Sequence, residues 1–192
     1  MKVPPPRYLF ILLSVFIVGA CTQNPQPQGK PLPHLTYENL NPYRPYGGGV
    51  EIRQSFKPDA ATTQTVAEFP VAPDELLQRY AGRRFDRNLS PVRMVFDIQK
   101  AALSKKSDEE NLVGFLSGAA EDYYTLEIAI AMFPAKADGT LTKPYTVSLK
   151  RELFIPQRAS LAEREITQFE FLEKAVHDID QVVTKFVTEN MR

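Results

Sequence analysis

The side chain with the most distinctive chemistry in this sequence is the thiol of Cys21, the only cysteine in a chain of 192 residues. A thiolate is a soft nucleophile and a natural acceptor for covalent modification. One cysteine cannot form an internal disulfide, and with only two histidines the chain has no Cys/His cluster that could hold zinc. Modification of the thiol is therefore the chemistry that Cys21 suggests.

Residues suited to catalysis or metal binding are present but isolated. His177 lies on a predicted helix without a nucleophile motif, and it is interpreted as a surface or structural residue. The acidic run 108–110 lacks the ligand spacing of an EF-hand. The glycines 47–49 lack the Gly-Lys-Ser/Thr ending of a phosphate loop and are interpreted as a hinge. We predict no catalytic residue, no metal site and no enzymatic activity.

The segment before Cys21 has the composition of an export signal. Lys2 and Arg7 give it a basic start without any acid, and 8–20 is apolar and ends in small residues. A membrane-spanning helix needs about 20 apolar residues, so this run is too short to cross the hydrocarbon core. Residues 1–20 are therefore predicted to be a secretory signal peptide. The alternatives are an uncleaved anchor, or an ordinary cleaved signal followed by a chance cysteine.

The apolar run closes with an aliphatic residue, two small residues and the cysteine, namely Val18, Gly19, Ala20 and Cys21. This pattern resembles the lipobox of bacterial lipoproteins. The resemblance implies that signal peptidase recognises Val18, Gly19 and Ala20 and cuts before Cys21. It also implies covalent diacylglycerol on the Cys21 thiol and an acyl chain on the new amino group. Apart from these lipids, no cofactor is expected.

The same resemblance implies where the protein resides. Several acyl chains buried in a bilayer give durable anchoring, so the membrane is an expected partner through the lipid anchor. In bacteria with two membranes, an Asp after the cysteine commonly retains lipoproteins at the inner membrane. Thr22 occupies that position here. The periplasmic face of the outer membrane is therefore the expected location, and the inner membrane is the alternative.

The rest of the sequence divides into a tether and one domain. Residues 21–46 are rich in proline, which favours extended conformers, and they are predicted to be the lipidated N-terminus and a semi-rigid tether. The alternative is a proline-rich ligand for an aromatic groove. Residues 47–192 have the length of a single domain, and the chain as a whole has a hydrophobic fraction of 43%, which is typical of globular proteins. Equal numbers of basic and acidic residues, 23 each, argue against a nucleic-acid partner.

Hydrophobic periodicity in 47–192 predicts four strands and two helices. Alternation of apolar and polar residues is typical of a sheet with one buried face, and it predicts strands at 50–56, 92–99, 124–132 and 145–155. Recurrence every three or four residues predicts helices at 72–85 and 160–191, while 57–70 is predicted to be a loop. The predicted fold is α+β, a mainly antiparallel sheet of about four strands with two helices on one face, the C-terminal helix long.

Charged residues on the two predicted helices are interpreted as structural. Ser160 and Glu163 form a capping box that starts the last helix. Arg83 and Arg84 end the first helix, where cations are favoured, and they are interpreted as solvated rather than as an acidic-ligand site. On the last helix, 178–180 carries two aspartates that are interpreted as surface carboxylates.

The segment 111–120 is apolar and punctuated by glycine. It is either a bent continuation of a strand, a loop folded onto the core, or a partly exposed flap that contacts a partner, an acyl chain or the membrane. The candidate contact residues of such a flap are Leu112, Val113, Phe115 and Leu116.

The whole layout is similar to the auxiliary lipoproteins of bacterial ABC-type lipid-transport systems and to a group of alphaproteobacterial lipoproteins. The resemblance implies a non-enzymatic accessory or scaffold module that binds another cell-envelope protein, with a sheet edge and the flank of 160–191 as contact surfaces. The alternative is a lipid or small-molecule carrier. Its cavity would lie between the sheet and the long helix, lined by Phe96, Ile128, Leu149, Phe169 and Phe186.

Overall fold

A computed structural model describes residues 37, 41–107 and 120–191. These residues all belong to one unit, Leu32–Arg192. The predicted lipidation and signal-peptidase residues 18–21 lie outside the described residues, and so does the candidate flap with Leu112, Val113, Phe115 and Leu116. Their assignments therefore stay predictions.

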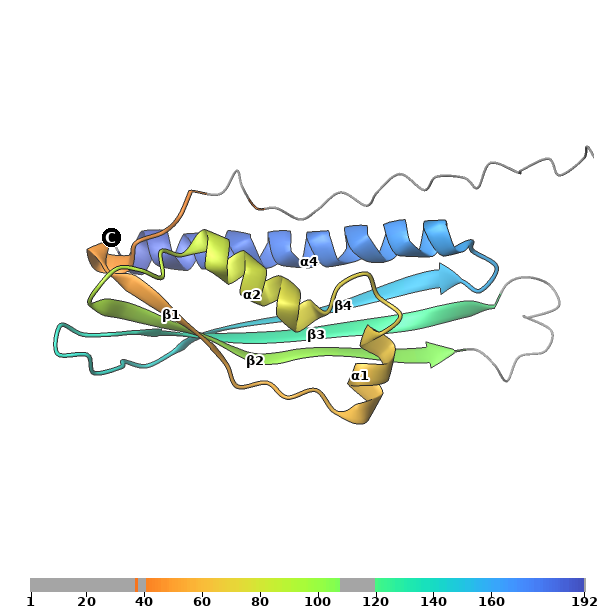
Figure 1. Ribbon diagram of the computed structural model, residues 1–192, viewed down its shortest axis with the longest axis horizontal. Coiled ribbons are helices and arrows are strands. Elements are labelled where there is room, and N and C mark those ends of the chain that lie inside the picture. The colour runs from red at the N-terminus through yellow and green to blue at the C-terminus, as the bar shows by residue number, and fades with distance from the viewer. Residues whose placement is uncertain (1–36, 38–40, 108–119, 192) are drawn as a thin grey trace, which may run out of the picture. The chain divides into compact units, whose positions relative to one another are not determined.

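The described unit is a four-stranded sheet with three α-helices packed on one of its faces (Figure 1). In chain order, the elements are η1 (Pro45–Gly47), β1 (Gly49–Gln54), α1 (Ala60–Val66), α2 (Pro73–Arg84), β2 (Val92–Ser107), β3 (Glu121–Pro134), β4 (Tyr145–Pro156) and α4 (Leu161–Asn190). The strands lie in the order β1-β2-β3-β4, and the pairs β2–β3 and β3–β4 are antiparallel. The predicted α+β class, with a mainly antiparallel sheet and a long C-terminal helix, is confirmed.

The first strand pairs with β2 in parallel, which the sequence did not predict. Parallel neighbours need a crossover of a dozen residues or more, and the segment with α1 and α2 supplies it. Phe85 follows α2 and packs against Phe96 of β2, with ring centroids 5.4 Å apart. The crossover therefore covers the sheet and also returns the chain to the end where β1 begins, so that β2 runs in the same direction.

The second strand continues to Ser107, beyond the predicted range 92–99. A register shift between Ile98 and Lys100 interrupts the alternation of apolar and polar residues at that point. After the shift, Ala101 and Leu103 point to the buried face that Phe96 and Ile98 occupy before it. The bulge inverts the alternation of apolar and polar residues, so the simple period of two hides the second half of the strand.

The last helix is capped as the sequence predicts. The Ser160 hydroxyl accepts from the backbone N–H of Glu163, and the Glu163 carboxylate accepts from the N–H of Ser160 at 2.8 Å. The 30 residues of α4 span about 45 Å at 1.5 Å per residue, which matches the 14 residues of β3 at about 3.3 Å each. The helix therefore covers the full length of the sheet. Among the described residues, no helix is both long and apolar enough to cross a membrane.

The helix α1 replaces the loop predicted at 57–70. Asp59 caps it, because its carboxylate accepts from the backbone N–H of Thr62 at 2.7 Å. Thr65 donates its hydroxyl to the carbonyl of Ala61 at 3.0 Å. A seven-residue helix rich in threonine and alanine shows no apolar stripe, so only the Asp59 cap signalled it in the sequence.

Of the three glycines after Tyr46, Gly48 and Gly49 are buried and closely packed rather than a free hinge, and Gly47 is exposed. Gly47 has a φ of 71°, a left-handed conformation that a side chain disfavours. A Cβ atom on Gly49 would overlap the carbonyl oxygen of Leu89. These glycines let the chain pass closely over the segment before β2 and enter β1.

Candidate functional site

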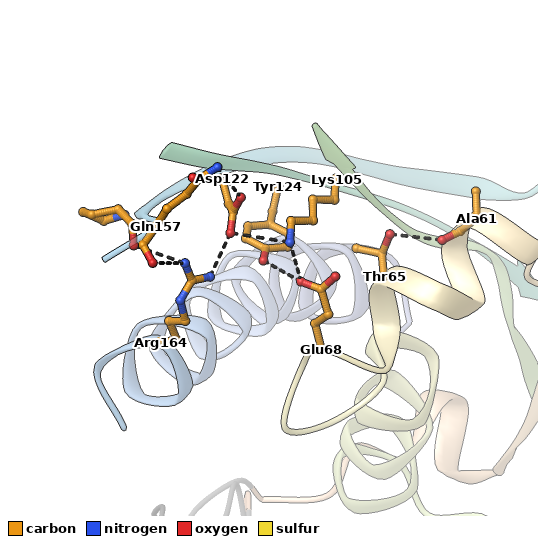
Figure 2. Close-up of polar contacts among 9 residues, drawn as sticks. Ala61, Thr65, Glu68, Lys105, Asp122, Tyr124, Gln157 and Arg164 are labelled. Carbon is orange, nitrogen blue, oxygen red and sulfur yellow. Dashed lines mark hydrogen bonds and ion pairs between the residues drawn. The ribbon is translucent and has the colours of Figure 1, made fainter. Parts of the chain in front are cut away.

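A cluster of charged side chains, here called the Asp122 cluster, lies where β2 ends and β3 begins (Figure 2). It consists of Asp122, Lys105, Arg164, Glu68 and Tyr124. The Asp122 side chain is buried on the helix-covered face, and its Oδ2 lies 2.8 Å from Nη1 of Arg164 and 3.5 Å from Nζ of Lys105. Arg164 comes from the first turns of α4, so the cluster ties this helix to the sheet.

Glu68 joins the same cluster from the turn after α1. Its Oε2 accepts from Nζ of Lys105 at 2.9 Å and from the hydroxyl of Tyr124 at 2.7 Å. Beside it, the ring of Phe69 meets that of Tyr124 edge to face, with centroids 5.1 Å apart. Figure 2 shows the carboxylates of Glu68 and Asp122 on opposite sides of the ammonium of Lys105. The turn after α1 and the start of β3 therefore converge on one lysine.

The protonation of this cluster fits a structural role. Burial raises the pKa of Tyr124 to about 12, and the hydrogen bond to Glu68 adds to the effect. Burial lowers the pKa of Lys105, but the hydrogen bond to Glu68 and the nearby Asp122 carboxylate outweigh it, so the net shift is upward. Both groups keep their protons at neutral pH, and neither can act as a general base there. The cluster fixes the strand ends that flank the segment 108–119.

The raised pKa values of the buried tyrosines predict that these phenols ionise only at strongly alkaline pH, and that their ionisation destabilises the fold. Burial raises the pKa of Tyr80 and of Tyr37 as well, and a nearby carboxylate adds to each shift. Because the folded pKa of Tyr124 exceeds its unfolded value, its contribution to stability is complete below about pH 10 and is lost as pH rises through about 12. Phenolate absorbance followed against pH, with circular dichroism, should show these tyrosines ionising late and together with unfolding.

The variant Tyr124→Phe is the control for this titration. It removes one late-ionising phenol, so the fall in the free energy of unfolding above about pH 10 should be shallower than in the wild type. Ionisation of every tyrosine near the ordinary phenol pKa, with the fold intact, would contradict the prediction.

A second cluster consists of Arg84, Asp180, Thr184 and Tyr43 and is here called the Arg84 cluster. It joins the end of α2 to α4 and to residues 41–44, which precede η1. Arg84 is buried, which corrects its interpretation as a solvated residue. Its Nε lies 2.8 Å from Oδ1 of Asp180, an ion-pair contact that is not aligned as a hydrogen bond. Its Nη2 donates to the hydroxyls of Thr184 at 2.9 Å and Tyr43 at 3.0 Å, and its guanidinium stacks 4.1 Å above the Tyr43 ring.

The aspartates of α4 are correspondingly more than surface carboxylates. Asp180 also accepts from the hydroxyl of Tyr80 at 2.7 Å. Asp178 pairs with Arg151, which β4 places on the helix-covered face. His177, between Val176 and Asp178, is exposed and hydrogen-bonds Gln181 at 3.0 Å. Within the described ranges, no group of three or more His, Cys, Asp or Glu side chains could hold a metal ion.

The sheet of the described unit ends at β4, which leaves a long edge of this strand unpaired. Twelve residues of β4 pair with β3 along one side, and no described strand pairs along the other. Gln157 N–H donates to the carbonyl of Ala120 at 2.9 Å, and the regular register then alternates between bonded and outward-facing residues. By this alternation, Ser148, Lys150 and Glu152 direct their backbone N–H and C=O groups to the free edge. Their side chains are exposed as well.

The residues predicted to line a carrier cavity do not form one together. Phe96 is fully buried and packs against the rings of Phe85 and Tyr80, and Ile128 is buried in the same core. Phe186 instead contributes to the wall of a cavity of about 700 Å³ near the C-terminal end of α4. That cavity was not predicted from the sequence.

Comparisons with known proteins place the chain near two solved structures. No protein-family model matches the chain, and no curated protein matches its sequence. A minor lipoprotein from Acinetobacter baumannii is 13% identical, over 73% of this chain and 90% of its own, with a TM-score of 0.37. A Caulobacter crescentus protein described as a lipoprotein is 10% identical, over 74% and 93% of the two chains, with a TM-score of 0.33. At these values the likeness establishes neither a shared family nor a shared function.

Proposed function

We propose that this chain is a lipid-anchored accessory protein of a bacterial cell envelope, and that it binds an extended segment of another envelope protein along the free edge of β4. The role is that of a non-enzymatic binding module. The long open edge of β4 is the observation that carries the proposal.

The anchor follows from the sequence around Cys21. An apolar run too short to span a bilayer ends in Val18, Gly19, Ala20 and Cys21, and the proline-rich residues 22–46 can extend away from the anchored cysteine. Lipid on Cys21 would hold the unit Leu32–Arg192 at a membrane surface, on the periplasmic face of the outer membrane. A partner in the same envelope would then be met at high effective concentration.

The partner surface follows from the length of β4. Edge strands are ordinarily short or protected, because their unpaired N–H and C=O groups invite another strand. Here the edge extends over Tyr145–Pro156, while a typical strand has about five or six residues. Pro144 and Pro156 delimit it, and no proline interrupts it between them. Addition of a strand would satisfy the outward N–H and C=O groups of Ser148, Lys150 and Glu152.

Proline substitution at an outward-facing position tests this proposal. Lys150→Pro removes one N–H from the free edge and none from the pairing with β3, so the fold should tolerate it. A photo-crosslinking residue at Ser148 should capture one envelope protein in cells, and Lys150→Pro should abolish the adduct. The matched variant Lys150→Ala removes the same side chain but keeps the N–H, and it should leave the adduct in place.

Three results would contradict the proposal. One is an adduct that survives Lys150→Pro. Another is an equally strong adduct from a crosslinker at the exposed Lys57, far from β4 in sequence and on no strand. The third is an adduct with twice the mass of the chain, which would identify the occupant of the edge as a second copy. Thermal unfolding of each variant verifies that the fold is intact.

A further inference from the structure

The cavity of about 700 Å³ near the C-terminal end of α4 has the composition of a ligand site. Its walls come from η1, the start of β2, the connection between β3 and β4, and the last turns of α4. A volume of this size fits within the range of small-molecule pockets. The residues of its walls include Tyr46, Arg93, Lys136, Lys143, Tyr145 and Phe186.

The charge of this cavity is one-sided. Arg93, Lys136 and Lys143 line it, and no Asp or Glu does. Within the described part of the chain, none of the three cations has an ion-pair partner, although ten such pairs form elsewhere in it. The Nε atom of Arg93 is buried and has no hydrogen-bond acceptor. A buried donor without an acceptor destabilises the fold, and an acceptor supplied by a ligand would relieve that cost.

The last carbonyls of α4 accept hydrogen bonds from Tyr46. The backbone N–H of Tyr46 donates to the carbonyl of Met191 at 3.0 Å, and the Tyr46 hydroxyl donates to the carbonyl of Asn190. These carbonyls carry the partial negative charge of the helix C-terminus, and Tyr46 already satisfies them. Among the described residues that line the cavity, the three cations therefore have no anionic partner.

The remaining wall is aromatic. The rings of Tyr145 and Phe186 stack with centroids 4.4 Å apart and planes 14° apart. The side chains of Tyr145 and Tyr46 are 41% and 50% exposed, which leaves part of their surface open to a further flat or apolar group. Cations beside exposed aromatic rings suit a ligand that joins an anion to an apolar body.

We infer that this cavity binds a phosphate ester, with its phosphate held by Arg93, Lys136 and Lys143 and its organic group against Tyr145. A guanidinium offers several fixed donors to phosphate oxygens, and the two lysines add mobile charge at the rim. The phosphate could come from a soluble aromatic phosphate or from a phospholipid headgroup. The inference is independent of the edge of β4, because no outward-facing residue of that edge lines the cavity.

Calorimetric titration of the purified full chain with phenyl phosphate, inorganic phosphate and phenol tests the inference. Phenyl phosphate should bind, and phenol and inorganic phosphate should each bind at least tenfold more weakly, because each supplies half of the recognised chemistry. Flotation with phosphatidylglycerol vesicles, against vesicles of a neutral glycolipid that carries no phosphate, reports on a headgroup source. Binding in the titration or in the flotation supports a phosphate site if Lys136→Gln with Lys143→Gln weakens it. The experiment that shows this binding identifies the source of the phosphate.

The decisive variant is Lys136→Gln with Lys143→Gln, because both lysines are exposed and their removal leaves the core untouched. It should weaken binding at least tenfold. The matched control is Lys57→Gln with Lys106→Gln, which removes the same charge from exposed positions that do not line the cavity and should leave affinity unchanged. No binding in either arm, equal binding of phenol, or equal losses in the two double variants would overturn the inference.

Discussion

Replacing Arg84 with alanine is expected to cost about 3–5 kcal/mol of the free energy of unfolding, the range for breaking a buried ion pair from one side. The substitution leaves Asp180 partly buried without its cation, and it removes donors to Thr184 and Tyr43. Domains of this size are stable by about 5–15 kcal/mol, so the variant should be close to unfolding at physiological temperature. Urea denaturation followed by circular dichroism measures the loss.

The neighbouring Arg83 provides a matched control. It has the same chemical type and the same helix end, but it is exposed. Arg83→Ala should change stability by no more than about 0.5 kcal/mol. The double variant Arg84→Met with Asp180→Leu should be more stable than Arg84→Ala, because no charge is then left unpaired. Equal and small losses for Arg83→Ala and Arg84→Ala would contradict the importance of the pair.

Replacing Cys21 with serine should abolish both lipidation and cleavage of the precursor. Serine has no thiol to receive diacylglycerol, and lipidation precedes cleavage in the proposed pathway, so the precursor should keep residues 1–20. Intact-mass measurement and membrane fractionation would detect the longer, unlipidated chain. The control is Thr22→Ser, which changes the next residue but keeps the thiol of Cys21. This variant should be lipidated and cleaved like the wild type.

The outcome that would refute the anchor is equally definite. If the Cys21→Ser chain is cut at the same place and stays with the membrane, residues 1–20 are an ordinary signal and the membrane contact lies elsewhere. The edge of β4 and the phosphate cavity are tested by separate measurements, so this result would leave them standing.

The elements that the sequence predicts well are those with an uninterrupted apolar period. The α4 stripe, its Ser160 cap and the alternation of β3 meet this condition. The elements that the sequence does not predict are those in which the apolar period is interrupted or absent. The register shift after Ile98 inverts the pattern of β2, and α1 has no stripe at all. Pairing direction is invisible in such patterns, because parallel and antiparallel half-buried strands alternate in the same way.

The polar clusters could not be predicted for a different reason. Helical spacing places Arg84 on the apolar face of α2 with Leu77 and Tyr80 and leaves Arg83 off it, but only the packing of α2 against α4 shows that Asp180 pairs with Arg84. Asp122 and Lys105 appear as ordinary strand residues until a helix covers their face. The phosphate cavity likewise assembles Arg93, Lys136 and Phe186 from three elements, and no spacing along the chain reports that proximity.

The parallel pairing of β1 has a consequence for the order of folding. The hairpins β2–β3 and β3–β4 and the helix α4 join neighbours along the chain, so each closes over a shorter connection, at smaller entropic cost, than the pair β1–β2 does. β1 must instead wait for the whole α1–α2 crossover before it meets β2, and contacts between distant residues form slowly. We expect the meander and α4 to form the nucleus, with β1 docking last. During export with the N-terminus first, the strand nearest the anchor would therefore emerge earliest and find its place latest.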